Sequence, residues 1–198
     1  MKVAITGGIG SGKSYVCRLL AKRGICVYDC DVAAKRLMRE DVQLQQALSE
    51  LVGSAVYSDG ILQKAVLAKF LLASERNKQA VNNIVHPAVA QDFMTSGYAW
   101  LESAILFESK FNERVPFDYI VCVSAPLEVR IRRIVSRDGI SREEALDWIN
   151  RQMAQEAVIE RSDYVIENDG RKYLEQQIEA LLKQINNKKN GNNTINCR

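Results

Sequence analysis

The chain has 198 residues, of which 47% are hydrophobic and 26% are charged, as is ordinary for a globular domain. Because 27 Lys+Arg face 24 Asp+Glu, the net charge of +3 is too small to indicate a nucleic acid or a membrane surface as a partner. The five cysteines include no C-x-x-C pair, which argues against a disulfide framework or a zinc site and favours a reducing compartment.

The chain begins with a predicted strand at residues 2–6, which is short, apolar and β-branched. This start does not resemble a signal peptide, and no apolar run approaches the about 20 residues that span a bilayer, so we expect a cytoplasmic protein with no membrane partner. Residues 7–14 read GGIGSGKS and fit the phosphate-binding P-loop pattern G-x-x-x-x-G-K-[ST]. A helix is predicted directly afterwards, since Val16, Leu19 and Leu20 recur at helical spacing. Strand, glycine loop and helix in this order predict a nucleotide site.

Phosphate binding explains the residue types of this loop. Glycines let the backbone bring its N–H groups against phosphate oxygens, and the positive end of the following helix faces the same anion. Lysine at position 13 can reach the β- and γ-phosphates, and the serine hydroxyl at position 14 can ligate Mg²⁺. The predicted nucleotide-binding residues are Gly8, Gly10, Ser11, Gly12, Lys13, Ser14 and Tyr15.

A second strand is predicted at residues 25–28 and ends at Asp29 and Asp31. A long helical region follows, which is more than a simple crossover needs and is a candidate substrate-binding subdomain. Asp59-Gly60 marks a turn within it, and Pro87 should kink or restart its last helix. The predicted helices of this region cover residues 32–39, 42–52, 62–72 and 77–94.

Strands return in the second half of the chain, separated by helices. The predicted strands cover 99–104, 119–123 and 163–166, and the helices 126–137, 142–160 and 171–186. The sequence SREE at 141–144 forms a capping box, and the Asn/Lys-rich segment 187–198 predicts a disordered tail. This alternation predicts an α/β fold with a parallel sheet flanked by helices. Since ligands of such sheets bind beyond the carboxyl ends of the strands, we expect the P-loop, Asp31, Glu102 and residues 168–170 along one rim.

Asp31 lies directly after the second strand, where an acceptor in line with the γ-phosphate would bind. A carboxylate there can take a hydroxyl proton or orient that hydroxyl for attack. The alternative is that Asp31 only caps the following helix, and Asp29 competes with it for either role. Position in the sequence does not decide between these interpretations.

Two glutamates are further candidates. Glu102 ends an apolar strand and suits a carboxylate that serves Mg²⁺ through water, although a surface glutamate would look the same. Glu108 can reach into the acceptor site or can be a solvated loop residue.

Cationic residues are numerous between positions 130 and 151. A mobile arginine can neutralise the charge of the γ-phosphate during transfer, and Arg137, beside Gly139, is our candidate. His86, the single histidine, is either a turn residue before Pro87 or a polar contact to the acceptor.

Taken together, the ordered motifs resemble the dephospho-CoA kinase family from Val3 to about Gly170. The resemblance includes TGGIGSGKS at 6–14, DCD at 29–31 where the family has D-A-D, and the pair His86-Pro87. It also includes LFE at 106–108, the lid segment with R-x-x-x-R-D at 133–138, and DYVIENDG at 163–170. It implies a P-loop kinase fold with a core of about 1–40, 98–125 and 162–186, a CoA-binding insertion of about 41–97 and a lid of about 126–160.

The resemblance also implies the reaction and the roles of residues. ATP with Mg²⁺ would phosphorylate the ribose 3′-hydroxyl of dephospho-CoA, with Asp31 as base or orienter and Lys13 and Arg137 at the transferring phosphate. The acceptor would contact Asp31, His86, Leu106 and Glu108, whereas Asn168 and Gly170 would lie near the adenine of ATP. Partners other than these small molecules are not implied, and the chain would act as a monomer or small homo-oligomer.

Three positions depart from the family pattern. Tyr15 replaces a threonine, Ala104 replaces the proline of P-L-L-F-E, and Trp148 occupies a lid position that is often arginine. The nearest alternative is another small-molecule kinase of the nucleoside or nucleotide type. A GTPase switch is excluded, because the chain has neither N-K-x-D nor D-x-x-G.

Overall fold

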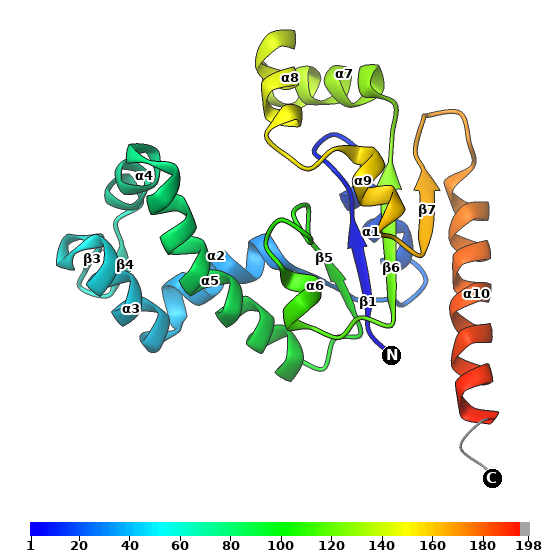
Figure 1. Cartoon of the computed structure of the whole chain (residues 1–198), viewed down its shortest axis with the longest axis horizontal. Coiled ribbons are helices and arrows are strands. Elements are labelled where there is room, and N and C mark those ends of the chain that lie inside the picture. Colours follow the sequence, from blue (N-terminus) through cyan, green and yellow to red (C-terminus); the bar gives the residue numbers. More distant parts are fainter. Residues whose placement is uncertain (195–198) are drawn as a thin grey trace. The chain divides into compact units, whose positions relative to one another are not determined.

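The computed structural model describes residues 1–194, and Figure 1 shows the order of its elements. The main sheet has the strand order β2-β5-β1-β6-β7, and β3-β4 form a separate antiparallel hairpin. The strands are β1 Val3–Thr6, β2 Val27–Asp29, β3 Tyr57–Ser58, β4 Ile61–Leu62, β5 Trp100–Glu102, β6 Tyr119–Ser124 and β7 Tyr164–Glu167. The helices are α1 Lys13–Ala21, α2 Cys30–Glu40, α3 Val42–Val52, α4 Lys64–Ala73, α5 Glu75–Thr95, α6 Phe111–Arg114, α7 Leu127–Asp138, α8 Arg142–Asn150, α9 Gln155–Glu160 and α10 Leu174–Thr194.

The chain divides into two compact units. The first contains Met1–Val27, Tyr98–Glu108 and the chain from Pro116 onward, and the second contains Tyr28–Gly97 and Ser109–Val115. The helical unit thus begins at residue 28, earlier than the boundary at 41 that we expected, because α2 packs against α5. The arginine-rich segment that we expected to be a lid, residues 126–160, belongs to the first unit.

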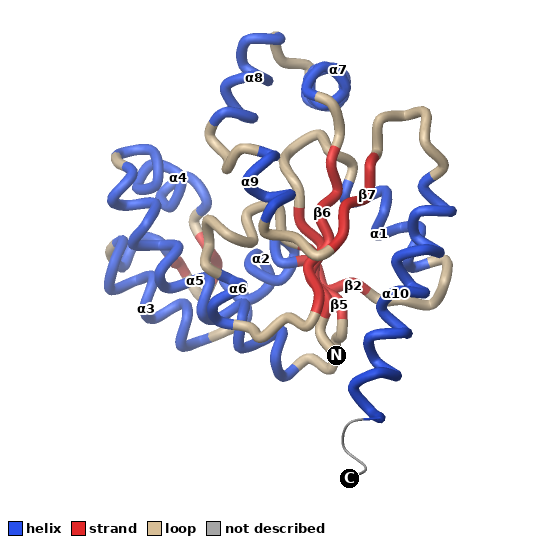
Figure 2. The backbone as a smooth tube through the Cα atoms, turned by 45° about the vertical axis from the view of Figure 1, so that its right-hand side comes forward, coloured by secondary structure: helices blue, strands red, loops and turns tan. Residues whose placement is uncertain are grey.

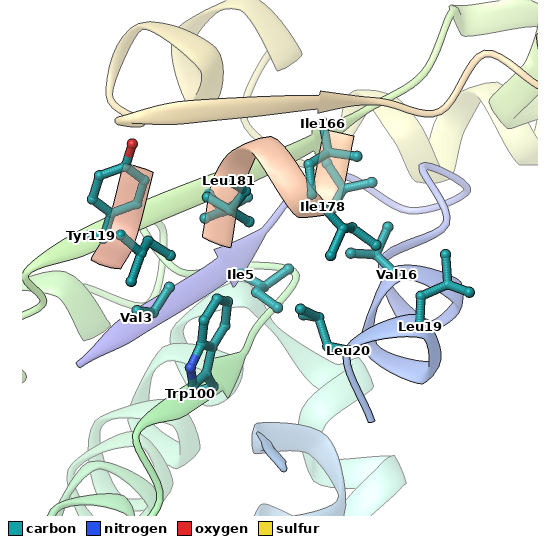
Figure 3. Packing of buried hydrophobic residues seen from close by; sticks show 13 residues of the cluster. Val3, Ile5, Val16, Leu19, Leu20, Trp100, Tyr119, Ile166, Ile178 and Leu181 are labelled. Atoms are coloured by element: carbon teal, nitrogen blue, oxygen red, sulfur yellow. The ribbon is translucent and has the colours of Figure 1, made fainter. Parts of the chain in front are cut away.

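The core of the first unit follows the alternation of its strands. Strand β1 pairs in parallel with β5 and β6, and β6 pairs in parallel with β7. Val3 and Ile5, two residues apart on β1, pack with Leu20 of α1 and with Ile178 and Leu181 of α10 (Figure 3). Figure 2 shows α10 on one side of the strands and α9 on the other, and α9 packs against β6. The sheet is therefore covered on both faces, as a parallel sheet requires.

The second unit is built around α5, against which α2, α3 and α4 pack. The buried residues Val85, Val89 and Phe93 are four positions apart, so they form one apolar stripe along α5. Asp59 and Gly60 both have positive φ, 50° and 77°, which suits the tight turn of the β3-β4 hairpin and confirms the turn predicted there. Among the described residues, no helix has both the length and the hydrophobicity that crossing a bilayer requires.

Two local expectations differ from the structure. Helix α5 runs without interruption through Pro87, so the predicted restart is wrong; the proline removes one N–H donor, but the apolar stripe continues on both sides of it. Helix α10 continues to Thr194, beyond the predicted end at 186. Lys188 ties this extension to the unit, because its Nζ donates to the Asp118 carbonyl at 2.7 Å and lies 5.0 Å from the Tyr119 ring centre. Residues 195–198 of the predicted tail lie outside the described residues.

Candidate active site

The strand ends of the first unit bring together segments that are far apart in sequence. The P-loop follows β1, Glu102 ends β5, and Asn168 follows β7. The Ser103 N–H donates to the Ile5 carbonyl at 3.0 Å, and the Asn168 N–H donates to the Ser124 carbonyl at 2.8 Å. These hydrogen bonds align the ends of neighbouring strands. The P-loop, Glu102 and Asn168 therefore lie at the carboxyl ends of the strands, as the predicted rim of this unit requires.

Helix α1 begins at Lys13 with an N-terminus that suits an anion. Its N-cap is Gly12, which has φ 94° and provides no side-chain cap. The first N–H groups of a helix generally lack an intrahelical acceptor; the Tyr15 N–H donates to the Gly12 carbonyl at 3.0 Å, but no cap side chain competes with an anion for this N-terminus. Ser14 and Tyr15 are exposed in this turn. The arrangement is that of a phosphate site open to solvent.

Lys13 and Glu102 form an ion pair beside the loop. The Lys13 Nζ lies 3.7 Å from the Glu102 Oε1, and it donates to the Gly8 carbonyl at 3.4 Å. Both charged side chains are largely buried, with 9% and 14% of their surface exposed, so each needs a partner of opposite charge. A bound phosphate would offer Lys13 a second anionic partner at the same place.

Ser14 and Glu102 fit a Mg²⁺ ion by their chemistry and position. Both offer oxygen atoms, the ligands that Mg²⁺ takes, and this ion usually keeps several waters and binds through few protein groups. Ser14 is exposed in the first turn of α1, and Glu102 ends the strand next to β1. Among the described residues, no group of three or more His, Cys, Asp or Glu side chains could hold a metal. Ser14 as a direct ligand and Glu102 through water stay the predicted Mg²⁺ ligands.

Arg130 of α7 packs directly on the P-loop. Its side chain belongs to a residue that is 5% exposed, and its Nε donates to the Ile9 carbonyl at 2.9 Å. A Cβ at Gly8 would lie 2.3 Å from Arg130 Nη2, and a Cβ at Gly10 would lie 2.8 Å from the Arg130 carbonyl oxygen. The close approach of the α7 backbone, together with a φ of 77°, therefore requires glycine at position 10, whereas a larger residue at position 8 would displace the Arg130 guanidinium.

Arg133 and Asn168 hold the next part of the loop. Arg133 Nη1 donates to the carbonyls of Gly10 and Ser11 at 3.2 and 3.1 Å, and Nη2 donates to the carbonyl and Oδ1 of Asn168 at 3.0 and 3.1 Å. Asn168 Nδ2 donates to the Ser11 carbonyl at 2.8 Å. Because C=O and N–H point in opposite directions across a trans peptide, the N–H of Gly12 points away from these donors. Arg133 and Asn168 thus orient and polarise the peptide group between Ser11 and Gly12, so that its N–H can bind an anion.

This network gives Asn168 a contact that the sequence did not predict. Its side chain is buried and donates to the P-loop, and its place near the adenine of ATP stays a prediction. Gly170, two residues later, is exposed and has a positive φ of 84° in the loop after β7. The sequence offered no signal for the contact to Ser11, which is 157 residues away.

The loop between α8 and α9 connects the P-loop with Glu108. Gln152 Oε1 accepts from the Ile9 N–H at 2.7 Å, and Glu108 Oε1 accepts from the Met153 N–H at 2.9 Å. Glu108 is exposed, as a residue that contacts an acceptor must be, but Leu106 is completely buried. The Leu106 side chain therefore supports this segment from inside, and its contact with the acceptor stays a prediction.

Arg137 lies one turn beyond Arg133 and does not contact the P-loop in this structure. Its Nε and Nη2 donate to Asp138 at 3.0 and 2.7 Å, and these hydrogen bonds raise its pKa. Residues 130, 133 and 137 share one helix face, so helical spacing was a signal that could have pointed to Arg130 and Arg133 as well. A role for Arg137 in phosphoryl transfer stays a prediction.

The second unit carries two of the expected acceptor residues, Asp31 and His86. Asp29 is the N-cap of α2, with its Oδ1 accepting from the Val32 N–H at 2.9 Å, and Asp31 is exposed in the first turn of the helix. The cap therefore belongs to Asp29, and the interpretation of Asp31 as a cap is wrong. His86 is half-buried within α5, so it is no turn residue; burial, and then the charge of Arg114, lower its pKa.

Known proteins resemble this chain over nearly its whole length. Residues 1–173 match the model of the family described as dephospho-CoA kinase. The dephospho-CoA kinase of Bacteroides fragilis strain YCH46 is 43% identical over 189 residues, which cover 92% of this chain and 91% of that protein. The dephospho-CoA kinase of Porphyromonas gingivalis is 36% identical over 194 residues, which cover 94% and 95%.

Solved structures agree with this result. A crystal structure from Thermus thermophilus has a TM-score of 0.76 at 33% identity and covers 94% of this chain and 97% of that one. Dephospho-CoA kinase from Campylobacter jejuni, at 21% identity and a TM-score of 0.64 over 93% and 98% of the two chains, shares the fold. So does shikimate kinase from Acinetobacter baumannii, at 16% and 0.58 over 95% and 94%. These matches confirm the predicted P-loop kinase fold, and the chain belongs to the dephospho-CoA kinase family.

Proposed function

We propose that this protein transfers the γ-phosphoryl group of ATP to the ribose 3′-hydroxyl of dephospho-CoA, giving CoA and ADP in the last step of CoA synthesis. The observation that carries the proposal is the P-loop. The helix after the loop begins without a side-chain cap, and Lys13 lies along the loop. Arg130 and Arg133 donate hydrogen bonds to the carbonyl groups of the loop. Family membership supplies the acceptor, which the loop does not specify.

The chain's own residues suit the donor half of this reaction. The first-turn N–H groups of α1 and the Lys13 ammonium bind the phosphates and stabilise the charge that spreads over the transferring group. Ser14 would hold Mg²⁺ directly and Glu102 would hold it through water, and the ion would supply further charge neutralisation between the phosphates. Arg137 would leave Asp138 and approach the transferring phosphate.

Asp31 is our candidate for activating the acceptor. It is exposed and has no cap function, so its carboxylate can orient the 3′-hydroxyl or take its proton. His86, Leu106 and Glu108 would contact the acceptor, and Asn168 and Gly170 would lie near the adenine of ATP.

A matched pair of variants tests the role of Asp31. Because general base catalysis contributes about 100-fold or more, Asp31→Asn should lower kcat by at least about 100-fold while the KM for ATP stays the same. Asp29→Asn is the control, since asparagine caps a helix as well as aspartate does, and it should keep kcat near that of the unchanged protein. If Asp31→Asn turned over at the unchanged rate, Asp31 would have no catalytic role.

The acceptor is tested with a panel of dephospho-CoA, nucleosides, nucleoside monophosphates and shikimate, each with ATP and Mg²⁺. We expect CoA as the main product, identified by mass spectrometry. Phosphorylation of another acceptor alone would replace the proposal by the alternative, a nucleoside or nucleotide kinase on the same scaffold.

We also infer a cytoplasmic location for the protein. The four cysteines among the described residues are Cys17, Cys26, Cys30 and Cys122, and of these Cys26 and Cys122 are free thiols. Free thiols persist in a reducing compartment, which supports this assignment. The remaining cysteine, Cys197, lies outside the part of the chain that the structure describes.

A further inference from the structure

A partly buried hydrogen-bond network lies beside the start of α2 in the second unit, in which the Arg36 and Asp92 side chains are 40% and 23% exposed. Tyr28, which is 6% exposed, donates from its hydroxyl to Asp92 Oδ2 at 2.6 Å. Arg36 Nη2 donates to the same oxygen at 2.6 Å. The Tyr28 ring packs edge to face on Phe93, with ring centres 5.3 Å apart. The Asp92 carboxylate of α5 therefore accepts one hydrogen bond from Tyr28, directly before the N-cap of α2, and one from Arg36 within α2.

The charges of this network match its geometry. Burial tends to raise the pKa of Asp92, but the hydrogen bonds from Arg36 and Tyr28 outweigh it, so the pKa of Asp92 is lowered. Burial, together with the bond to Asp92, raises the pKa of Tyr28 far above its usual range. At neutral pH Tyr28 is therefore the donor and Asp92 the acceptor of this hydrogen bond.

Two residues of the network, Tyr28 and Arg36, lie on either side of Asp31 in the sequence. Tyr28 directly precedes Asp29, the N-cap of α2, and Asp31 lies in the first turn of that helix. Arg36 follows later on the same helix. A displacement of about 1 Å in a catalytic group can cost about 100-fold in rate, so the anchoring of this turn has a measurable consequence.

We propose that Tyr28 is a positioning residue for phosphoryl transfer, whose hydroxyl bond to Asp92 holds the first turn of α2 so that the Asp31 carboxylate keeps its catalytic orientation. The proposal rests on the proposed function, in which Asp31 activates the acceptor. It assigns no contact with substrate to Tyr28, because the side chain is buried.

Tyr28→Phe isolates the hydroxyl, since phenylalanine keeps the ring contact with Phe93. We expect kcat to fall about 5- to 20-fold with an unchanged KM for ATP, because the hydroxyl acts through orientation. The matched control is Tyr57→Phe. The Tyr57 hydroxyl donates to the Met38 carbonyl at 2.7 Å, near the other end of α2, so this variant removes the same group far from Asp31 along the helix. Both variants should melt at a lower temperature, but Tyr57→Phe should keep its kcat.

A double-mutant cycle separates positioning from general stability. In an Asp31→Asn background, measured by single turnover, Tyr28→Phe should cause no further loss, because the orientation of a missing carboxylate no longer matters. The same fold-loss in both backgrounds, or equal kcat values for Tyr28→Phe and Tyr57→Phe, would overturn the proposal and leave the proposed function standing. Full activity of Asp31→Asn alone would overturn the role of Asp31 and this proposal with it.

Discussion

The contact between Arg133 and the P-loop yields the sharpest prediction for the donor site. One guanidinium makes four hydrogen bonds of 3.0–3.2 Å, two to the carbonyls of Gly10 and Ser11 and two to Asn168. The planar fork of arginine matches acceptors on two sides, whereas the ammonium of lysine is a single point on a flexible stem. Arg133→Lys keeps the charge and removes this geometry.

The expected magnitude follows from the bonds lost. A hydrogen bond to a charged group contributes about 1.5–3 kcal/mol, and water replaces part of this because Arg133 is half-buried. We therefore expect the free energy of unfolding to fall by about 2–3 kcal/mol, or the melting temperature by about 4–12 °C. Since the peptide between Ser11 and Gly12 loses its fixed orientation, the affinity for ATP should fall about tenfold, which corresponds to about 1.4 kcal/mol.

Isothermal titration with a non-hydrolysable ATP analogue and thermal unfolding measure these two quantities. The control is Arg132→Lys, because Arg132 is the exposed neighbour on α7 and the substitution makes the same chemical change. If Arg133→Lys bound the analogue as tightly as Arg132→Lys and melted at the same temperature, the four hydrogen bonds of Arg133 would neither stabilise the protein nor orient the loop for ATP.

Two further predictions concern a glycine and the histidine. Gly12→Ala places a Cβ 2.1 Å from Asn168 Nδ2 at φ 94°, whereas the Cβ of the control Gly24→Ala, at φ 77°, meets no atom within 4 Å. Only Gly12→Ala should abolish binding of the ATP analogue. Equal binding by both variants would show that the contact with Asn168 does not matter. Because burial and Arg114 lower the pKa of His86 in the folded chain, the unfolded chain binds a proton more readily below the usual pKa of 6.5. Stability should thus decrease as pH falls from 7 to 5, less so in His86→Gln, and parallel melting curves for both proteins would contradict this reasoning.

Several features followed from the sequence because they depend on neighbours in the chain. The P-loop needs a strand, a glycine segment and a helix in immediate succession, and Lys13 and Ser14 follow at fixed positions. The capping box of α8 was predicted in the same way, and both of its bonds are present between Ser141 and Glu144. Together with the family motifs, these local signals were sufficient for the fold class and for the family.

Choices between similar groups needed the structure. Asp29 and Asp31 flank the same helix start, and the extended backbone of Asp29, with φ −92° and ψ 111°, decides that it is the one that caps. Arg137, two residues before Gly139, was the predicted phosphate contact, but Arg130 and Arg133 of the same helix are the arginines that donate to the loop in this structure.

The sequence by itself determined the donor site, because a P-loop is a contiguous segment whose glycines and lysine imply their own geometry. Only the tertiary structure decided how that segment is held. Its supports come from Arg133, which is 123 residues from Gly10, and from Asn168, which is 157 residues from Ser11. Helical and strand periodicities carry no information over such separations. The register of parallel strands and the packing of α7 bring these side chains to the loop, and those arise only when the whole unit has folded.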